Sequence, residues 1–175
     1  MLGQQVSVAA ARTLAGRLVA ACGMPLVAPD RALTHVFPTA QAVADAPLER
    51  LGLTRARAAS LRGFAQAVAS GTLDLGAFRD LDDAVARLTA LPGIGDWTAQ
   101  YLAMRALGEP DAFPAGDLGV RQALAHAGRV PSERETRTRA ESWRPWRAYA
   151  VLALWTEPSS KTLERTKPLT RKAAR

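Results

Sequence analysis

The chain of 175 residues contains one cysteine, Cys22, and few aromatic side chains. A lone cysteine excludes an internal disulfide, a zinc site built on cysteines and an iron–sulfur cluster ligated by cysteines. Long apolar runs are also missing, because polar residues interrupt each stretch before it reaches the length that a bilayer requires. We see no charged-then-apolar leader either. We therefore expect a globular protein of a reducing compartment, the cytoplasm, with neither secretion nor membrane insertion.

Lysine is absent from most of the chain. All three lysines, Lys161, Lys167 and Lys172, lie in the last fifteen residues, while the other basic residues are arginines. Schiff-base chemistry needs an amine nucleophile. The preceding part of the sequence has no lysine that could supply one.

The same fifteen residues carry most of the net charge. The whole chain has a net charge of +7, and six basic residues against Glu164 give this tail +5 of it. A basic tail attracts polyanions without selecting among them, so a solvated tail and a phosphate-binding tail both remain open. We expect one domain over residues 1–157 and a basic, disordered tail over 158–175.

Apolar residues recur with a spacing near 3.6, and no segment alternates as a half-buried strand does. Thr39 and Thr54 are predicted helix N-caps, and Gly71 is a predicted C-terminal stop. About eight helices with short connections predict an all-α domain. The expected ranges are 6–21, 30–36, 39–45, 54–69, 81–92, 96–107, 117–127, 132–142 and 145–155.

The segment Leu91-Pro-Gly-Ile-Gly-Asp-Trp-Thr98 joins two of these helices. Pro92 ends the first helix, and Gly93 and Gly95 allow backbone conformations that a Cβ would hinder. Ile94 can fill the space between the helices. The second helix then begins with unpaired backbone N–H groups at its positive end, which suits a phosphate. A plain turn between two helices is the alternative, but the full string favours binding to a DNA backbone.

This string resembles the helix–hairpin–helix of base-excision DNA glycosylases, and residues 91–101 most resemble the branch called DNA-3-methyladenine glycosylase II. Three further stretches match that family in order, and the resemblance covers about residues 1–157. It implies the helical glycosylase fold without the family's usual N-terminal sheet-containing domain. The chain starts within the first helical pattern, so we expect it to be N-terminally truncated relative to the family. The three stretches are Leu2-Gly-Gln-Gln-Val-Ser7, Phe113-Pro-Ala-Gly-Asp-Leu118, and Trp143-Arg-Pro-Trp-Arg-Ala-Tyr-Ala150 with Leu154-Trp155.

Asp117 directly precedes an apolar-periodic segment, where an aspartate is often only a helix N-cap. The resemblance implies that it is also the catalytic carboxylate. Glycosidic cleavage passes through a sugar that resembles an oxocarbenium cation, which a nearby anion stabilises. The same group can orient or deprotonate the attacking water. Asp96 and Asp111 match no catalytic position of the family.

Trp97 and Tyr101 lie four residues apart on one predicted helix face, a spacing that is also typical of core packing. The resemblance implies that Trp97, Tyr101 and Trp155 line a pocket for the flipped base. A purine alkylated at N3 or N7 is cationic, and aromatic faces attract such a base by stacking and cation–π interaction. Three further aromatic residues are expected in the core beneath the pocket: Trp143, Trp146 and Tyr149.

Other roles follow from the resemblance. Gln5 is the expected wedge that fills the vacated base stack, although a solvent-facing glutamine is the alternative. The expected phosphate-binding hairpin comprises Pro92, Gly93, Ile94, Gly95 and Thr98. A structural Na⁺ or K⁺ is expected on the backbone carbonyls of Thr89, Leu91 and Ile94, with no cofactor for catalysis. His35 and His126 fit no metal-ligand spacing, and the arginines that could contact phosphates are Arg62, Arg121, Arg144 and Arg147.

The resulting hypothesis is a monofunctional DNA glycosylase of the bacterial cytoplasm and nucleoid. It would excise N-alkylated purines, such as 3-methyladenine and 7-methylguanine, from duplex DNA and leave an abasic site. The alternatives are a glycosylase for another lesion, a non-catalytic helix–hairpin–helix module that binds DNA, and an inactive truncated fragment. We expect a monomer, with fusion to or association with a repair methyltransferase as a further expectation.

Overall fold

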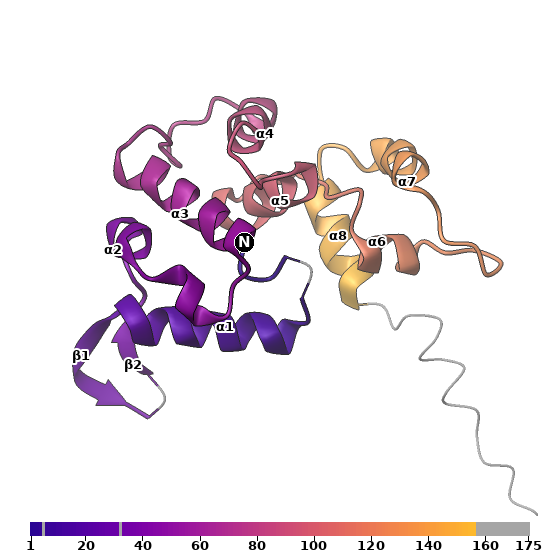
Figure 1. The fold of residues 1–175 in the computed structure, drawn as a ribbon. Helices are drawn as coiled ribbons and strands as arrows, with labels where there is room; N and C mark the ends of the chain where they lie inside the picture. Colours follow the sequence, from indigo (N-terminus) through magenta and orange to yellow (C-terminus); the bar gives the residue numbers. More distant parts are fainter. Residues whose placement is uncertain (5, 32, 157–175) are drawn as a thin grey trace, which may run out of the picture. The chain divides into compact units, whose positions relative to one another are not determined.

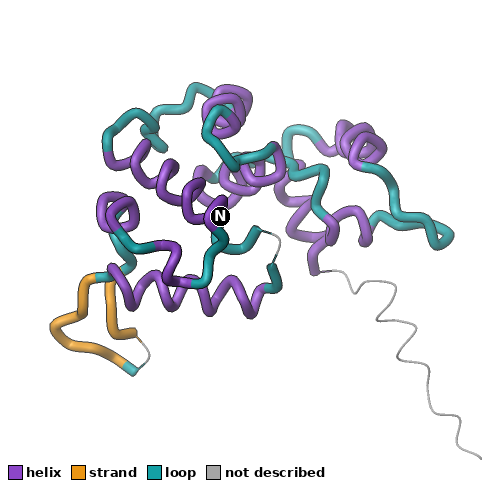
Figure 2. Tube along the Cα trace, in the orientation of Figure 1, coloured by secondary structure: helices purple, strands orange, loops and turns teal. Residues whose placement is uncertain are grey.

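The computed structural model describes residues 1–4, 6–31 and 33–156 (Figures 1 and 2). The predicted tail, 158–175, lies outside the described residues. The chain forms two compact units, Met1–Ala99 and a second one from Gln100 onward. No helix among the described residues is long and apolar enough to cross a membrane.

The first unit is mainly helical (Figure 1). Its core joins Leu14 and Leu18 of the first helix to Val43, Leu48 and Ala58. Each fully buried leucine removes enough apolar surface from water to contribute roughly 1.5–3 kcal/mol. The elements are α1 (Val8–Cys22), β1 (Met24–Asp30), β2 (Leu33–Val36), α2 (Ala40–Asp45), the 3₁₀ helix Leu48–Leu51, α3 (Arg55–Ala69) and α4 (Leu81–Thr89), and α5 (Asp96–Leu102) begins in this unit and ends in the second.

Side-chain caps determine where several of these helices begin. The Thr39 and Thr54 hydroxyls accept hydrogen bonds from the amides of Ala42 and Arg57, as the sequence predicts. The first helix differs from the prediction, because it begins only at Val8, where the Ser7 side chain caps it. A hydroxyl that binds the third following amide satisfies a donor that the helix leaves unpaired.

The predicted helix over 30–36 is wrong. Asp30 ends β1 and Leu33–Val36 form β2 of an antiparallel pair, in which Met24 pairs with Val36 and Asp30 with Leu33. Arg31 turns the chain with a left-handed φ of 51°, which a helix does not allow. The strands are short and largely exposed, so the two-residue alternation that marks a half-buried strand is missing from their sequence.

The regular elements in the described part of the second unit are helices, apart from an isolated β-bridge between His126 and Arg129. Its core includes Phe113, Val120 and Val151, with the Trp143 ring edge-on to Phe113 at 6.0 Å between ring centroids. Trp146 and Tyr149 were expected in the core, yet they are 58% and 61% exposed. Its elements are the end of α5, a π turn Ala103–Leu107, α6 (Leu118–Ala123), α7 (Glu133–Ala140), the 3₁₀ helix Glu141–Trp143 and α8 (Arg147–Thr156).

The helix predicted over 117–127 ends earlier than expected. The last residue of α6 is Ala123, and Ala127 and Gly128 follow with positive φ angles of 49° and 77°. Those two residues turn the chain so that the amides of His126 and Arg129 bond to each other's carbonyl groups. The next helix, α7, begins at a capping box formed by Ser132 and Glu135.

Candidate functional site

Asp117 occupies the N-cap of α6 and is half-buried. Its Oδ1 accepts a hydrogen bond from the Val120 amide at 2.9 Å, so the predicted capping role is confirmed. The same oxygen accepts a second hydrogen bond, also at 2.9 Å, from the indole Nε1 of Trp155 on α8. Two donors on different helices therefore fix the direction of this carboxylate.

Tyr101 extends this group. The centroids of the Tyr101 and Trp155 rings lie 6.0 Å apart, and the ring planes are tilted by 41°. Both rings are half-buried. The second unit thus brings together three of the predicted site residues, a carboxylate and two aromatic rings. Tyr101 and Trp155 meet although 54 positions separate them in the sequence.

Gly119 is part of this group, and sequence reasoning missed it. A Cβ on Gly119 would stand 3.2 Å from Asp117 Oδ1 and 3.3 Å from Trp155 Cδ1. Both distances are tighter than most Cβ contacts, so a side chain here would push the carboxylate and the indole apart by a few tenths of an ångström. The available signal was a glycine in the first turn of a predicted helix, where the residue has poor helix propensity.

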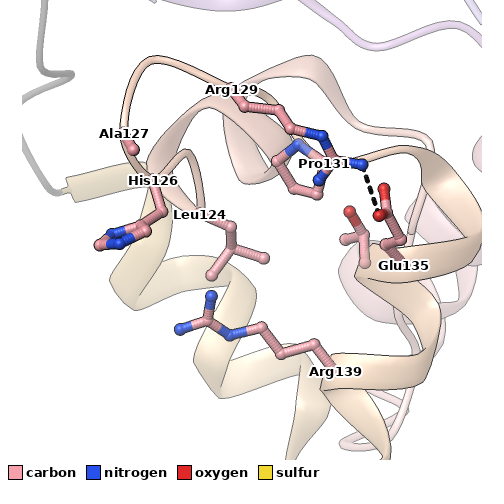
Figure 3. Close-up of a pocket in the computed structure, with 8 residues that line it drawn as sticks. Leu124, His126, Ala127, Arg129, Pro131, Glu135 and Arg139 are labelled. Atoms are coloured by element: carbon pink, nitrogen blue, oxygen red, sulfur yellow. Dashed lines mark hydrogen bonds and ion pairs between the residues drawn. The ribbon is translucent and has the colours of Figure 1, made fainter.

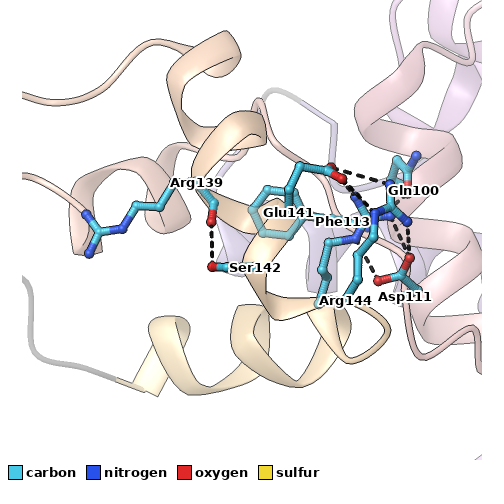
Figure 4. Close-up of polar contacts among 8 residues, drawn as sticks. Gln100, Asp111, Phe113, Arg139, Glu141, Ser142 and Arg144 are labelled. Atoms are coloured by element: carbon cyan, nitrogen blue, oxygen red, sulfur yellow. Dashed lines mark hydrogen bonds and ion pairs between the residues drawn. The ribbon is translucent and has the colours of Figure 1, made fainter.

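The loop that leads to Asp117 is held by its own backbone and by α5. The amide of Asp117 bonds to the Pro114 carbonyl at 2.8 Å, and the amide of Phe113 bonds to Gln100 Oε1 at 2.9 Å. Figure 4 shows Gln100 and Phe113 near Asp111 of this loop and near Glu141 and Arg144. Buried backbone groups paired in this way resist displacement, because each one would otherwise lose a hydrogen bond.

The predicted hairpin lies between α4 and α5 in the first unit. Gly93 has a φ of +80°, and a Cβ on it would lie 1.9 Å from the hydroxyl oxygen of Ser60 on α3. The glycine is therefore required both by the backbone conformation and by the close approach of α3. Ile94 is 4% exposed, consistent with its predicted place between helices, and its amide bonds to the Leu91 carbonyl at 3.2 Å.

Thr98 and Gln4 join this hairpin to the start of the chain. The Gln4 side-chain amide donates to the Thr98 hydroxyl at 2.7 Å and to the Gly93 carbonyl at 3.3 Å. Thr98 is only 5% exposed, so its hydroxyl faces the protein. Sequence reasoning did not identify Gln4. Its neighbour Gln5, the predicted wedge, lies outside the described residues, and Trp97 is half-buried on α5.

The carbonyl groups named for a cation have a donor chemistry that fits Na⁺ or K⁺. Hard monovalent and divalent cations prefer oxygen ligands, and Thr89, Leu91 and Ile94 each supply a backbone oxygen. The Leu91 carbonyl already accepts the Ile94 amide, but a carbonyl oxygen has a second lone pair. No group of three or more His, Cys, Asp or Glu residues suited to a metal occurs in the part of the chain that the structure describes.

The four candidate phosphate-contacting arginines are all engaged with protein groups. Arg62 bonds to Glu49, and this bond lowers the pKa of the Glu49 carboxyl to about 2. Arg121 donates to the Pro131 carbonyl at 2.8 Å. Arg144 and Arg147 contact carboxylates, and Arg147 is 6% exposed, so it is not a surface residue.

A hollow of about 520 Å³ lies beside α7 (Figure 3), and its lining contains none of the predicted site residues. His126 and Arg139 line it, and so do Arg129 and Glu135, which form an ion pair at 2.6 Å. That bond is the largest cause of the lowered pKa of the Glu135 carboxyl, which falls to about 2. Its other lining residues are Leu124, Ala127, Pro131 and Thr136.

Comparisons with known proteins identify relatives named as DNA repair enzymes. The chain is 45% identical over 156 residues to the "Probable bifunctional transcriptional activator/DNA repair enzyme AlkA" of Mycobacterium tuberculosis (strain CDC 1551 / Oshkosh). This match covers 89% of this chain and 32% of that protein. It is 38% identical over 158 residues to "DNA-3-methyladenine glycosylase 2" of Escherichia coli (strain K12), covering 89% of this chain and 54% of that protein. The chain thus spans about a third and about half of these relatives.

Solved structures show the same fold. A 3-methyladenine DNA-glycosylase from Archaeoglobus fulgidus matches with a TM-score of 0.76 and 29% identity, over 88% of this chain and 54% of that one. The Mag1 glycosylase of Schizosaccharomyces pombe, solved in complex with abasic DNA, matches in fold with a TM-score of 0.73 and 24% identity, over 88% of this chain and 74% of that one. The family model described as HhH-GPD superfamily base excision DNA repair protein matches residues 1–148. This match confirms the resemblance predicted from the motifs: the chain belongs to the HhH-GPD superfamily of base-excision DNA repair proteins.

Proposed function

We propose that the protein is a monofunctional DNA glycosylase that excises N-alkylated purines from duplex DNA. The observation that carries this proposal is the Asp117 carboxylate, whose Oδ1 is fixed by the Trp155 indole next to the Tyr101 ring. A carboxylate held in one direction can stabilise positive charge without first reorganising. The names of the relatives support the same chemistry, since one is called DNA-3-methyladenine glycosylase 2.

Asp117 acts on the sugar in this proposal. As the bond between the base and C1′ lengthens, the sugar gains the character of an oxocarbenium cation, and the carboxylate stabilises that charge. The same carboxylate orients the attacking water or accepts its proton. The base leaves with the bonding electron pair, and the product is an abasic site.

The aromatic residues hold the departing base. Tyr101 and Trp155 offer ring faces to a flipped purine, and Trp97 is included as the third member from the family resemblance. An N3- or N7-alkylated purine is already cationic, so cation–π attraction contributes roughly 0.5–2 kcal/mol to its binding. A cationic base also leaves without being protonated by the enzyme, so no strong general acid is needed.

DNA binding is assigned to the hairpin between α4 and α5. Pro92, Gly93 and Gly95 are exposed, and the amides of the two glycines, which have no side chain, can approach a phosphate closely. Thr98 contributes through its backbone, because its hydroxyl is buried against Gln4. Gln5 is the wedge in this proposal. A monovalent cation on Thr89, Leu91 and Ile94 would hold the hairpin's carbonyl groups in place.

The absence of lysine from residues 1–160 supports the monofunctional assignment. Strand cleavage by a glycosylase requires an amine that forms a Schiff base with the sugar. Residues 1–160 contain no lysine, and the α5 positions after the hairpin carry Trp97, Gln100 and Tyr101. We therefore expect the abasic strand to remain intact after excision.

The test compares wild type with Asp117→Asn on duplex DNA that carries 7-methylguanine or 3-methyladenine. Asparagine caps helices as well as aspartate does and keeps an oxygen that can accept the Trp155 hydrogen bond. The substitution therefore removes the charge and little else. We expect the rate of base release to fall on the order of 100-fold or more, in line with the loss of one electrostatic transition-state contact.

The matched control is Asp80→Asn, because Asp80 caps α4 and accepts the Asp83 amide at 2.8 Å. This variant should release bases at the wild-type rate. Equal release by wild type and Asp117→Asn would remove Asp117 from the mechanism. DNA binding by wild type without any base release would favour a non-catalytic DNA-binding module, and alkali-independent strand cleavage would refute the monofunctional assignment.

A further inference from the structure

Arg147 and Asp111 form a buried, two-pronged ion pair in the second unit. Arg147 is the first residue of α8, and its side chain is 8% exposed. Its Nε donates to Asp111 Oδ1 at 2.7 Å and its Nη2 donates to Oδ2 at 2.9 Å. The planar guanidinium thus matches both carboxylate oxygens at once, which fixes orientation as well as distance.

Two more charged residues extend this pair (Figure 4). Glu141 Oε1 accepts from Arg147 Nη1 at 3.3 Å, and Glu141 Oε2 accepts from Arg144 Nε at 2.8 Å. Arg144 Nη1 also contacts Asp111. Two cations and two anions balance one another, so removing either central partner leaves an uncompensated charge in a largely buried place.

This network is one of two places where the loop before α6 is bonded to α8. Asp111 stands six residues before Asp117 on the same loop, and Arg147 stands eight residues, about two helical turns, before Trp155 on α8. The amide of Ala148 adds a hydrogen bond to the Pro110 carbonyl at 2.9 Å. The loop and the helix are therefore joined at two points, by Asp111 and Arg147 at one and by Asp117 and Trp155 at the other.

We infer that Asp111 and Arg147 are positioning residues for base excision: they fix the register of α8 on the loop and so keep the Trp155 indole on the Asp117 carboxylate. This inference rests on the proposed function. Their bonds join the loop to α8 at Asp111 and Arg147, six and eight residues away from Asp117 and Trp155 in sequence, so we assign them a positioning role. A fork on a carboxylate has one matching register, whereas apolar contacts would tolerate a small slide of the helix.

The experiment uses Arg147→Lys, which keeps the positive charge and removes the fork. Two readouts are compared below each protein's unfolding temperature. One is the single-turnover rate of 7-methylguanine release at saturating enzyme, measured beside the Kd for an abasic-site duplex. The other is the NMR signal of the Trp155 indole N–H, assigned with Trp155→Phe. Arg129→Lys, in the exposed pair with Glu135, is the matched control.

We expect Arg147→Lys to shift the indole signal and to lower the rate on the order of 100-fold, since a displacement of about 1 Å can have that effect. The Kd should stay within about twofold of wild type, and Arg129→Lys should change none of these values. Asp111→Asn should act in the same direction. If Arg147→Lys does not fold, Arg144→Lys at the exposed edge of the network should shift the signal and the rate by smaller amounts.

An unchanged indole signal together with an unchanged rate in the folded variants would overturn the inference. A weaker Kd with an unchanged rate would also overturn it, because the network would then act in DNA binding. Failure of the proposed function is distinguishable: wild type would release no base, while the indole signal would still decide whether the ion pair positions Trp155.

Discussion

Gly93→Ala should destabilise the protein by an amount that the contact with Ser60 largely determines. The native φ of +80° suits glycine, and a residue with a Cβ is strained there by roughly 1–2 kcal/mol. The new methyl group would also lie 1.9 Å from Ser60 Oγ and 2.6 Å from Ser60 Cβ. Relieving such an overlap costs typically about 1–3 kcal/mol. The free energy of unfolding should therefore fall by about 2–5 kcal/mol.

Ser60→Gly separates these two contributions. It removes both overlapping atoms and leaves the Ser60 Cα, which would lie 3.8 Å from the new Cβ, an ordinary contact distance. Ser60→Gly has its own effect of about 1 kcal/mol, because a glycine inside a helix is unfavourable. In the Ser60→Gly background only the backbone strain remains, so Gly93→Ala should then reduce the unfolding free energy by about 1–2 kcal/mol.

The measurement is a double-mutant cycle from urea unfolding of the four proteins. We expect a coupling free energy of about 1–3 kcal/mol between the two positions. Gly95→Ala is the control within the same hairpin, because a Cβ there would meet nothing within 4 Å, and it should change the unfolding free energy by about 0.5 kcal/mol or less. Additive effects of Ser60→Gly and Gly93→Ala would refute the close approach of α3 to the hairpin.

Two further predictions concern the second unit. Trp155→Phe keeps an aromatic ring but removes the donor to Asp117 Oδ1, and the single-turnover rate should fall roughly 10- to 100-fold, since a hydrogen bond to a charged group contributes about 1.5–3 kcal/mol; an unchanged rate would show that the indole N–H has no part in excision. Glu135→Gln should lower the thermal midpoint at pH 7. The pKa of Glu135 is lowered to about 2 in the folded protein, so its ionised carboxylate stabilises the fold at pH values above the pKa of the unfolded chain, and this stabilisation is lost as the pH falls toward 2. The difference in midpoint from wild type should shrink from pH 5 to pH 3, and a constant difference would contradict the assignment to charge.

Features that depend on a few adjacent residues could be predicted from the sequence. Thr39, Thr54 and Asp117 each cap a helix as expected, since a cap is a bond between a side chain and an amide three residues away. The hairpin string likewise indicated the turn between α4 and α5. These signals are local, so neighbouring sequence contains all the information that they require.

Features that join distant segments could not be predicted in the same way. Gln4 binds Thr98 across 94 residues of sequence, and Gly93 packs against Ser60. Nothing in the residues around Gln4 distinguishes it from a solvent-facing glutamine. The error at Trp146 has a related cause, because the neighbouring residues do not show whether a distant segment covers an aromatic side chain.

Capping and catalysis place different demands on residue 117. The cap needs only an oxygen that accepts the Val120 amide, and asparagine supplies one as well as aspartate does. A negative charge at a helix N-terminus adds about 0.3–1 kcal/mol, a small part of the stability of a folded domain. In the proposed mechanism, in contrast, a cationic sugar gains its main stabilisation from that charge. The proposed chemistry therefore requires the charge of this side chain, whereas the fold scarcely requires it.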